Sequence, residues 1–352
     1  MPLSAVFHTS SLRKQVAALG DAFAIAGEFL HCDTINSGHI NMTFRATYRK
    51  MDGTTDRYIF QRVNDAVFPC PRDVMHNVEK VTNHIRWKML RVLKTPFRQT
   101  LNLYSARGGR KYLEIPGSGF WRCYNCIENT HTFDVADHPR QAYEAARAFG
   151  AFQQLLCDMN PEDIHETIPF FHHTRRRFDH LEKAAAADSH GRLNTCRKEL
   201  DFIRRRERYV DVLLDLQERG ELPVRIVHND TKINNVMLDR ETDKAVCVID
   251  LDTVMPGSIL YDFGDMVRTM TSPAAEDEED LDKTYLRMPM FEAVVKGYLD
   301  AVKDFITPQE ISKLAFSGLL ITLETGIRFL TDYLEGDVYF KTERERHNLH
   351  RA

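Results

Sequence analysis

The stretch RIVHNDTKINNVMLD, residues 225–239, sets a polar loop between two short apolar runs. Polar side chains fill positions 228–235, broken only by Ile233. A second apolar run, AVCVIDLDT at 245–253, follows after the polar segment DRETDK. Short apolar runs joined by a polar turn are typical of a β-hairpin, so we expect the flanks of the turn to pair.

The predicted hairpin gathers oxygen ligands at one place. It brings Asp230 and Asn235 near Asp250, and on an extended strand Asp250 and Asp252 point to the same face. Carboxylates crowded together with an amide need a cation, and hard oxygen ligands favour Mg²⁺ or Mn²⁺ over zinc. The sequence therefore predicts a magnesium or manganese site, with two or three carboxylates and an amide in one pocket.

This pattern is also the one that phosphoryl transfer requires. Kinases place an Asp, then an Asn five residues later, then a metal-binding Asp downstream, and Asp230, Asn235 and Asp250 match that order and spacing. Lys232 is suited to contact the transferring phosphate and to neutralise developing charge. We expect His228 to hydrogen-bond the backbone and hold the loop. The alternative is a polar turn, capped by Asn and Asp, that has no catalytic role.

Chain length and composition narrow the class of protein. A chain of 352 residues suits two domains or lobes around a cleft. A net charge of -4 gives no attraction to nucleic acid or to an anionic membrane. The seven cysteines include one C-x-x-C, Cys123 and Cys126, with no second pair at zinc spacing. We expect a reducing compartment and a cytoplasmic protein without a nucleic-acid or membrane partner.

The two parts of the chain differ in the secondary structure that their sequence patterns predict. The first part has strand-like segments, a helix with a regular apolar stripe at 71–90, and a hairpin at 111–128. From Pro139 onward helical patterns dominate, and the most apolar stretch, 314–330, contains charged residues that favour a buried helix over a membrane span. The predicted fold is α+β, with a lobe at 1–128 built around a small sheet and a mainly helical lobe at 129–352.

Five segments of the chain carry a family resemblance. They are GHINMT at 38–43, VHNDTKINN at 227–235, IDLDTVMPGS at 249–258, LYDFGD at 260–265 and RFLTDYLEGDVYF at 328–340. The chain resembles the aminoglycoside phosphotransferase/choline kinase superfamily, which has a protein-kinase-like fold, and is most similar to its N-acetylhexosamine 1-kinases. Asn229 stands where the superfamily usually has glycine.

The resemblance implies roles for the catalytic and sugar-binding residues. Asp230 would be the base facing the anomeric hydroxyl, and Asn235 and Asp250 would bind Mg²⁺. The sugar pocket would be lined by Asp252, Thr253, Arg328 and Tyr339. Asp262 is expected to brace the catalytic loop. For Arg328 the residues alone also allow an ion pair with Glu324, one helical turn away.

The nucleotide side of the resemblance is less complete. Gly38, His39, Ile40 and Asn41 would form the loop over the ATP phosphates through backbone N–H groups. Gln61 occupies the strand position where kinases have a lysine, and Glu79 would be the partner of that lysine. The missing lysine leaves two alternatives: either Gln61 makes neutral contacts to phosphate, or Lys232 carries more of the charge.

These observations define three alternatives for function. The first is an ATP- and Mg²⁺-dependent kinase of N-acetylglucosamine or N-acetylgalactosamine in amino-sugar salvage, acting as a monomer or weak dimer. The second keeps the fold but changes the acceptor to an aminoglycoside, a choline-like molecule or another small hydroxyl compound. The third is a nucleotide-binding pseudokinase, which only the missing lysine favours.

Overall fold

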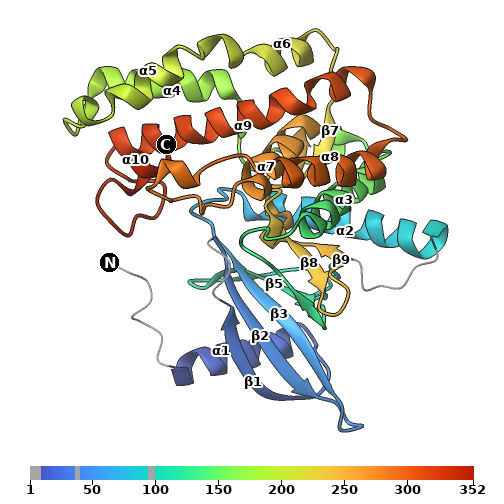
Figure 1. Cartoon of the computed structure of the whole chain (residues 1–352). Helices are drawn as coiled ribbons and strands as arrows, with labels where there is room; N and C mark the ends of the chain where they lie inside the picture. The colour runs from blue at the N-terminus through green and yellow to red at the C-terminus, as the bar shows by residue number, and fades with distance from the viewer. Residues whose placement is uncertain (1–8, 36–39, 94–99) are drawn as a thin grey trace. The chain divides into compact units, whose positions relative to one another are not determined.

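The computed structural model describes residues 9–35, 40–93 and 100–352. The chain divides into two compact units, the first reaching Asn129 and including His165–Ile168, the second comprising Thr130–Ile164 and Pro169–Ala352. An antiparallel sheet dominates the first unit, and helices dominate the second (Figure 1). The predicted α+β class is therefore confirmed.

The first unit contains a five-stranded antiparallel sheet in the order β1-β2-β3-β5-β4. Its strands are β1 Glu28–Ile35, β2 Met42–Arg49, β3 Thr55–Val63, β4 Leu113–Ile115 and β5 Gly119–Asn125. The run FAIAGEFLHCDTI, residues 23–35, is strand-like in sequence and predicts an earlier start for β1. The strand starts later because Ala24 and Gly27 have positive φ angles of 53° and 109°, which turn the chain after helix α1, Thr9–Ala22.

The two faces of this sheet differ sharply in polarity. One face packs against α1 and is aromatic, with the rings of Phe23 and Phe60 5.9 Å apart. On the other face, strand register aligns Thr43 of β2, Gln61 of β3 and Arg122 of β5 in one row. Side chains alternate between the faces of a strand, so this polar row is separated from the aromatic core by the backbone of the sheet.

Helix α2, Pro71–Lys88, is the long helix expected after the third strand. Its apolar stripe is buried as predicted, and the buried residues are Val74, Val78, Val81 and Ile85. Pro71 occupies the first turn, where its missing N–H costs nothing. The helix runs on into a π-helical turn, Met89–Leu93.

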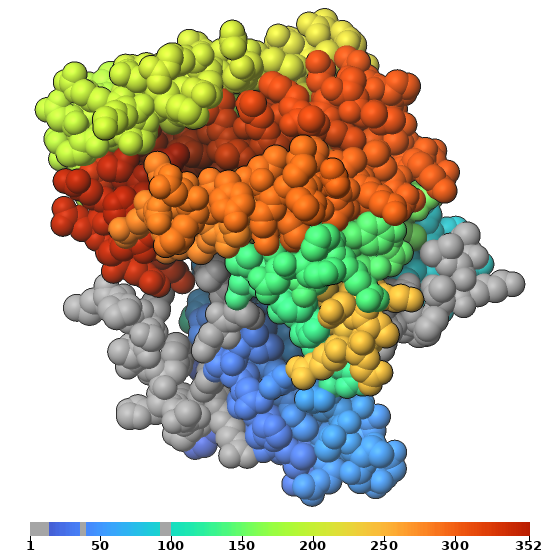
Figure 2. Space-filling view, in the orientation of Figure 1, coloured from blue at the N-terminus to red at the C-terminus, as the bar shows by residue number. Residues whose placement is uncertain are grey.

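Helices of the second unit pack in pairs around two apolar clusters. The helices are α3 Pro139–Leu156, α4 Thr174–Ala187, α5 Arg197–Arg204, α6 Val212–Glu218, α7 Ile259–Thr271, α8 Met288–Val302, α9 Pro308–Leu334 and α10 His347–Arg351. Figure 2 shows the yellow-green segment that holds α4 to α6 lying along the red-orange α9. Helix α9 is long and apolar enough to span a membrane by composition, but 61% of that window is buried within the protein, as for a core helix.

Short strands carry the polar loop of the second unit. The apolar flanks form β8, Val236–Asp239, and β9, Ala245–Val248, which pair as the predicted hairpin. A two-residue strand β6, Thr130–His131, adds to β8. Strand β7, Arg225–Val227, leads into the loop and pairs with β10, Met255–Gly257.

A close helix contact fixes α7, which follows β10. A Cβ atom at Gly264 would lie 2.4 Å from the carbonyl oxygen of Ser317 on α9, too near for any larger residue. Gly264 lies between Asp262 and Asp265 in sequence. The tight α7–α9 contact therefore holds in place the two carboxylates that brace the polar loop.

Candidate active site

The polar loop starts with a buried histidine that has a structural role. His228 Nε2 donates to the carbonyl oxygen of Ile249 at 2.9 Å, and its Nδ1 accepts from the N–H of Asp230 at 3.3 Å. Its ring also meets those of Phe149 and Phe152 edge-on. Both ring nitrogens are engaged by the backbone, so His228 holds the loop as expected and has no free site to act as a base.

The backbone conformation of Asn229 is one that suits the glycine expected at this position from the resemblance. Its φ angle is 65°, in the left-handed region that glycine adopts freely and asparagine tolerates. The side chain offsets the strain, since its amide donates to the carbonyl oxygen of Thr253 at 2.9 Å. Asparagine thus keeps the backbone turn and adds a hydrogen bond to the segment after β9.

The carboxylate of Asp262 braces the loop from α7. It accepts hydrogen bonds from the backbone N–H groups of His228 and Asn229, at 2.9 and 2.7 Å, and from the amide of Gln153 at 2.7 Å. Burial raises the pKa of Asp262, and these three donors oppose that shift. The bracing role predicted for Asp262 is confirmed.

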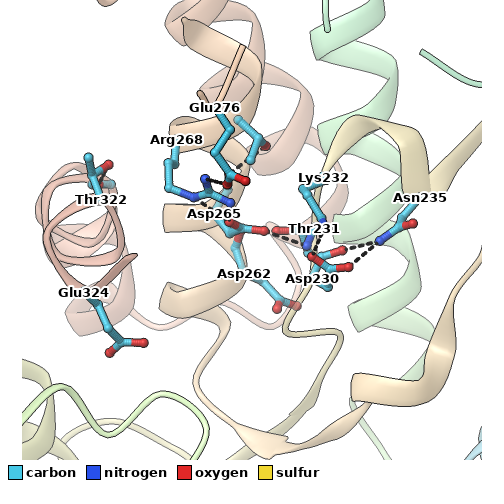
Figure 3. Close-up of polar contacts among 12 residues, drawn as sticks. Asp230, Thr231, Lys232, Asn235, Asp262, Asp265, Arg268, Glu276, Thr322 and Glu324 are labelled. Carbon is cyan, nitrogen blue, oxygen red and sulfur yellow. Dashed lines mark hydrogen bonds and ion pairs between the residues drawn. The ribbon is translucent and has the colours of Figure 1, made fainter. Parts of the chain in front are cut away.

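A second carboxylate of α7 holds the middle of the loop. Asp265 accepts from the N–H of Thr231 at 2.9 Å, and its other oxygen pairs with Arg268 at 2.9 Å. Arg268 in turn pairs with Glu276 at 2.7 Å (Figure 3). The sequence offered a signal for this chain of contacts that we did not use: Asp262 and Asp265 are three residues apart, on one face of a helix.

Asp230 lies at the centre of the site with two polar neighbours. Lys232 Nζ is 3.0 Å from Asp230 Oδ1, and Asn235 Nδ2 donates to Asp230 Oδ2 at 2.9 Å (Figure 3). Burial disfavours the charged carboxylate, but the Lys232 ammonium and these hydrogen bonds hold the pKa of Asp230 below its ordinary value. The side chain is 23% exposed, so an ionised carboxylate is available to an incoming hydroxyl group.

The orientation of Asn235 suits a metal ligand. Its Nδ2 also donates to the backbone carbonyl of Asp230 at 2.8 Å, so both described bonds of the side chain use the nitrogen. Oxygen Oδ1 therefore points away from Asp230 (Figure 3). The N–H of Ile249 donates to the Asn235 carbonyl at 2.9 Å, and Asp250 is the next residue in the chain. An amide oxygen and a carboxylate are donors that fit Mg²⁺.

One detail of the predicted metal site was wrong. Asp250 and Asp252 do not share one face of an extended strand, because β9 ends at Val248, Asp250 has φ 60° and Leu251–Thr253 forms a 3₁₀ turn. Within residues 9–35, 40–93 and 100–352, no group of three or more His, Cys, Asp or Glu side chains could hold a metal. An ion held by Asn235 and Asp250 would need water or phosphate oxygens for its remaining ligands.

The residues expected to face the sugar after β9 are largely buried. Asp252 is 2% exposed and Thr253 is 7% exposed. The Thr253 hydroxyl donates to the carbonyl oxygen of His228 at 2.7 Å, so it supports the catalytic loop. The sugar-facing roles of Asp252 and Thr253 stay predictions.

Arg328 does not form the ion pair that its spacing allowed. Glu324 accepts instead from His172 Nδ1 at 2.8 Å and from the Thr174 hydroxyl. The Arg328 guanidinium lies over two aromatic rings, 5.3 Å from the centre of Phe171 and 5.6 Å from that of Phe340.

A second arginine lies beside Arg328. Arg177 donates to the backbone carbonyl of Phe171 at 3.1 Å, while its buried Nε has no hydrogen-bond partner among the described residues. Burial, together with the charge of Arg328, lowers the pKa of Arg177. The sequence did not single out Arg177, because nothing local marks it apart from its neighbours Arg175 and Arg176.

Tyr339 is held in a loop that one carboxylate organises. Asp332 accepts from the N–H groups of Val338, Tyr339 and Phe340, at 2.9, 2.7 and 2.9 Å. The Asn348 amide of α10 also donates to Asp332, at 2.8 Å. The Tyr339 side chain is 60% exposed, so it is free to contact a ligand.

The buried Glu324 gives the second unit a defined pH response. Burial favours the neutral acid, but His172, Thr174 and Arg328 together hold the pKa of Glu324 below its ordinary 4.5. A depressed folded pKa contributes stability that is present above the unfolded value and is lost as pH falls through the folded value. The destabilisation caused by Glu324→Gln should therefore shrink as pH falls below about 4.5.

Urea unfolding of the wild type and Glu324→Gln across this range checks the expectation. Glu335→Gln is the control, since Glu335 pairs with His180 at an exposed site. A destabilisation by Glu324→Gln that is the same at neutral and acid pH would contradict the assigned pKa shift.

The nucleotide-side residues lie in the first unit, where Gly38 and His39 fall outside the described residues. Ile40 and Asn41, the other two residues of the predicted phosphate loop, contact Asn64, which follows β3. The Asn64 N–H donates to Asn41 Oδ1, and the Asn64 amide donates to the carbonyl oxygen of Ile40. Gln61 lies on β3 as predicted, with its side chain on the polar face of the sheet. Glu79 lies on α2 and forms no ion pair with a described residue.

Arg122 is the residue of this unit that the sequence reasoning missed. It is 1% exposed on β5 and donates two hydrogen bonds to Gln61 Oε1, at 3.1 and 2.9 Å. The available signal was a single arginine in the apolar stretch FWRCYNC, residues 120–126. The structure describes all seven cysteines as free thiols.

The chain matches one protein family and is similar in fold to several solved structures. The model of the phosphotransferase enzyme family (APH) matches residues 31–293. Among solved structures, an ethanolamine kinase of Plasmodium vivax is 14% identical, with a TM-score of 0.56, covering 99% of this chain and 90% of its own. A microcompartment-associated aminopropanol kinase is 14% identical, with a TM-score of 0.53, covering 96% of this chain and 93% of its own.

A third solved structure extends the likeness to antibiotic kinases. Spectinomycin phosphotransferase, solved with ADP and spectinomycin, is 11% identical, with a TM-score of 0.52, covering 96% of this chain and 93% of its own. At such low identity these structures show a shared fold, which is the protein-kinase-like fold expected. The family match spans the sheet, the polar loop and α7, and the chain belongs to the phosphotransferase enzyme family.

Proposed function

We propose that the protein transfers the γ-phosphoryl group of ATP to the anomeric hydroxyl of an N-acetylhexosamine. The observation that carries this proposal is the ionised, partly exposed Asp230 held between Lys232 and Asn235. The segments that resemble N-acetylhexosamine 1-kinases support the choice of acceptor. We also propose a role in amino-sugar salvage, which follows from this choice of acceptor. The free thiols support a cytoplasmic location.

In this proposal Asp230 orients the sugar hydroxyl and accepts its proton as the bond to phosphorus forms. Lys232 contacts the transferred phosphoryl group and offsets the negative charge that develops there. Asn235 Oδ1 and Asp250 would hold Mg²⁺, which would supply positive charge to neutralise and align the phosphates. The buried hydrogen bonds that Asp262 and Asp265 accept from the loop backbone keep the loop rigid, so that Asp230 needs no rearrangement to react.

On the acceptor side, Arg328, Tyr339, Asp252 and Thr253 would contact the sugar. Arg328 is oriented by the rings beneath it, and such a cation offers several N–H donors to sugar hydroxyl or acetamido oxygens. Asp332 fixes the backbone that presents Tyr339.

The acidic run at 276–282 bears on the aminoglycoside alternative. A polycationic acceptor would need free carboxylates, but the acids of this run are largely paired within the protein. The ion pairs are Glu276–Arg268, Asp277–Arg344, Glu278–Lys283, Glu279–Arg344 and Asp280–Lys283. This pairing favours a neutral acceptor such as an N-acetylated sugar.

A direct assay tests the proposal. Purified protein is incubated with Mg-ATP and a panel containing N-acetylglucosamine, N-acetylgalactosamine, glucosamine, choline, ethanolamine and kanamycin, and ADP release is followed. Turnover is expected with at least one N-acetylhexosamine. Turnover confined to choline, ethanolamine or kanamycin would overturn the acceptor assignment, and Mg-ATP binding without turnover of any acceptor would indicate a pseudokinase.

Replacing Arg328 with lysine should weaken acceptor binding specifically. Lysine keeps the charge but loses the planar fork that stacks on Phe171 and donates in pairs. We expect KM for the sugar to rise about tenfold, with KM for ATP within about twofold of wild type. Arg176→Lys is the control, because Arg176 stacks on Phe170 with no expected sugar contact. Equal effects in the two variants would contradict the role of Arg328.

A further inference from the structure

Arg122 is an unusual occupant of a sheet interior. It is the largest of the side chains that the described structure buries almost completely. Arginine is rarely buried to this degree unless its charge serves a purpose, since removing it from water is costly. Its surroundings include the ring of Tyr124, with the centre 5.1 Å from the guanidinium carbon, and Met75 Sδ of α2 at 3.9 Å.

The contacts of Arg122 fix the orientation of one amide. Its Nε and one terminal nitrogen both donate to Gln61 Oε1, at 3.1 and 2.9 Å. Arginine has no acceptor, so the atom that faces it must be the oxygen of Gln61. The Gln61 NH₂ group therefore points the other way, where it donates to the Thr43 hydroxyl at 3.0 Å.

This arrangement makes the amide a stronger donor than an isolated glutamine. The NH₂ group has two hydrogens, and the described structure gives it one acceptor, Thr43. A cation bound to the amide oxygen polarises the group and strengthens its N–H bonds as donors. Gln61 is only partly buried, so the second hydrogen is available to an anionic oxygen.

Kinases use a lysine on this strand to hold the nucleotide phosphates, paired with a glutamate of the following helix. Here the strand position is Gln61, and the charge lies directly across the ladder on β5. Glu79, four residues after Met75, lies on the corresponding helix. The positive charge therefore lies on β5, one strand away from the usual lysine position on β3. Gln61 occupies that position on β3 and provides a hydrogen-bond donor there.

We propose that Arg122 is a positioning residue that makes Gln61 the phosphate-contacting donor of the nucleotide site, so that the two together replace the missing lysine. Gln61 Nε2 donates to a phosphate oxygen of ATP, and Arg122 supplies the positive charge behind it. The inference rests on the proposed use of ATP but not on the identity of the acceptor.

Nucleotide binding without an acceptor tests the proposal. Calorimetry gives the Kd of Mg-AMPPNP for the full-length wild type and for Arg122→Met, Gln61→Glu and the double variant Gln61→Lys/Arg122→Met. Arg122→Met keeps the volume but removes the charge, and Gln61→Glu keeps the contact to Arg122 but removes the donor. Each is expected to weaken binding about tenfold or more, the effect of one charge-assisted hydrogen bond.

The double variant gives the sharpest outcome. A lysine at position 61 restores the charge on the strand, so binding should return to within about threefold of wild type. Arg45→Gln, an exposed arginine of the same sheet that pairs with Asp33, is the control expected to bind normally. If Arg122→Met does not fold, Gln61→Glu alone decides, because position 61 is partly exposed and the glutamate can pair with Arg122.

Two results would overturn the inference: unchanged binding by Gln61→Glu, or a double variant that binds no better than a folded Arg122→Met. Because no sugar is present in this experiment, its outcome is independent of the acceptor assignment. A protein that binds Mg-AMPPNP through Gln61 but phosphorylates no N-acetylhexosamine would contradict only the proposed acceptor.

Discussion

Replacing Asp230 with asparagine should lower kcat about 10³-fold while leaving KM for both substrates within a few-fold of wild type. Asparagine has the same shape and can still accept a hydrogen bond from Lys232. Its NH₂ group replaces the oxygen that accepts from Asn235, but the Asn235 amide keeps its bond to the backbone carbonyl of residue 230, so the loop should keep its structure. It cannot accept a proton from the sugar hydroxyl at neutral pH. The loss therefore falls on the chemical step, and steady-state kinetics with each substrate varied in turn measures it.

The control for this variant is Asp201→Asn, at an exposed position of α5. Its kinetics should match wild type. If Asp230→Asn retained kcat within tenfold of wild type, or if its KM for ATP rose in proportion to the loss of kcat, Asp230 would not be the base.

Replacing Asp262 with alanine should lower the free energy of unfolding by about 3 kcal/mol or more. The reason is that three donors lose their acceptor at once, the N–H groups of His228 and Asn229 and the Gln153 amide. These groups are buried, so in the variant each would lack a hydrogen bond both to the protein and to water, which raises the free energy of the folded state. Urea unfolding, followed by circular dichroism at fixed pH, measures the change.

Asp262→Asn separates the loss of the acceptor from the loss of the side chain. The amide keeps one oxygen for the loop but turns an NH₂ group toward donors that it cannot satisfy, so an intermediate loss is expected. A destabilisation of less than about 1 kcal/mol by Asp262→Ala would show that the carboxylate is not what holds the loop.

The parts of this site that the sequence predicted well are local. The hairpin of β8 and β9 follows from a polar turn between two apolar runs, and the stripe of α2 follows from helical spacing. The spacing of Asp230 and Asn235 was enough to predict that they meet, because they are only five positions apart in the chain. In each case the determining contacts lie within one element or one turn.

The parts that were missed depend on register and on single backbone angles. Arg122 meets Gln61 because β5 pairs with β3 at one particular register, over a separation of 61 residues. The turn at Asp250 depends on the left-handed backbone conformation of that one residue. Aspartate tolerates this conformation, but its presence in a sequence does not predict it. Arg328 had a plausible helical partner in Glu324, which the more distant His172 and Thr174 occupy instead.

Phosphoryl transfer to the anomeric oxygen leaves a product in which phosphorus is bonded through oxygen to carbon 1 of the sugar. The product formed from Mg-ATP and the N-acetylhexosamine turned over fastest is examined by two-dimensional ¹H–³¹P correlation NMR. We expect a phosphorus signal coupled to the anomeric proton of the sugar. A phosphorus signal coupled to the protons on carbon 6, or to any other ring position, would contradict it.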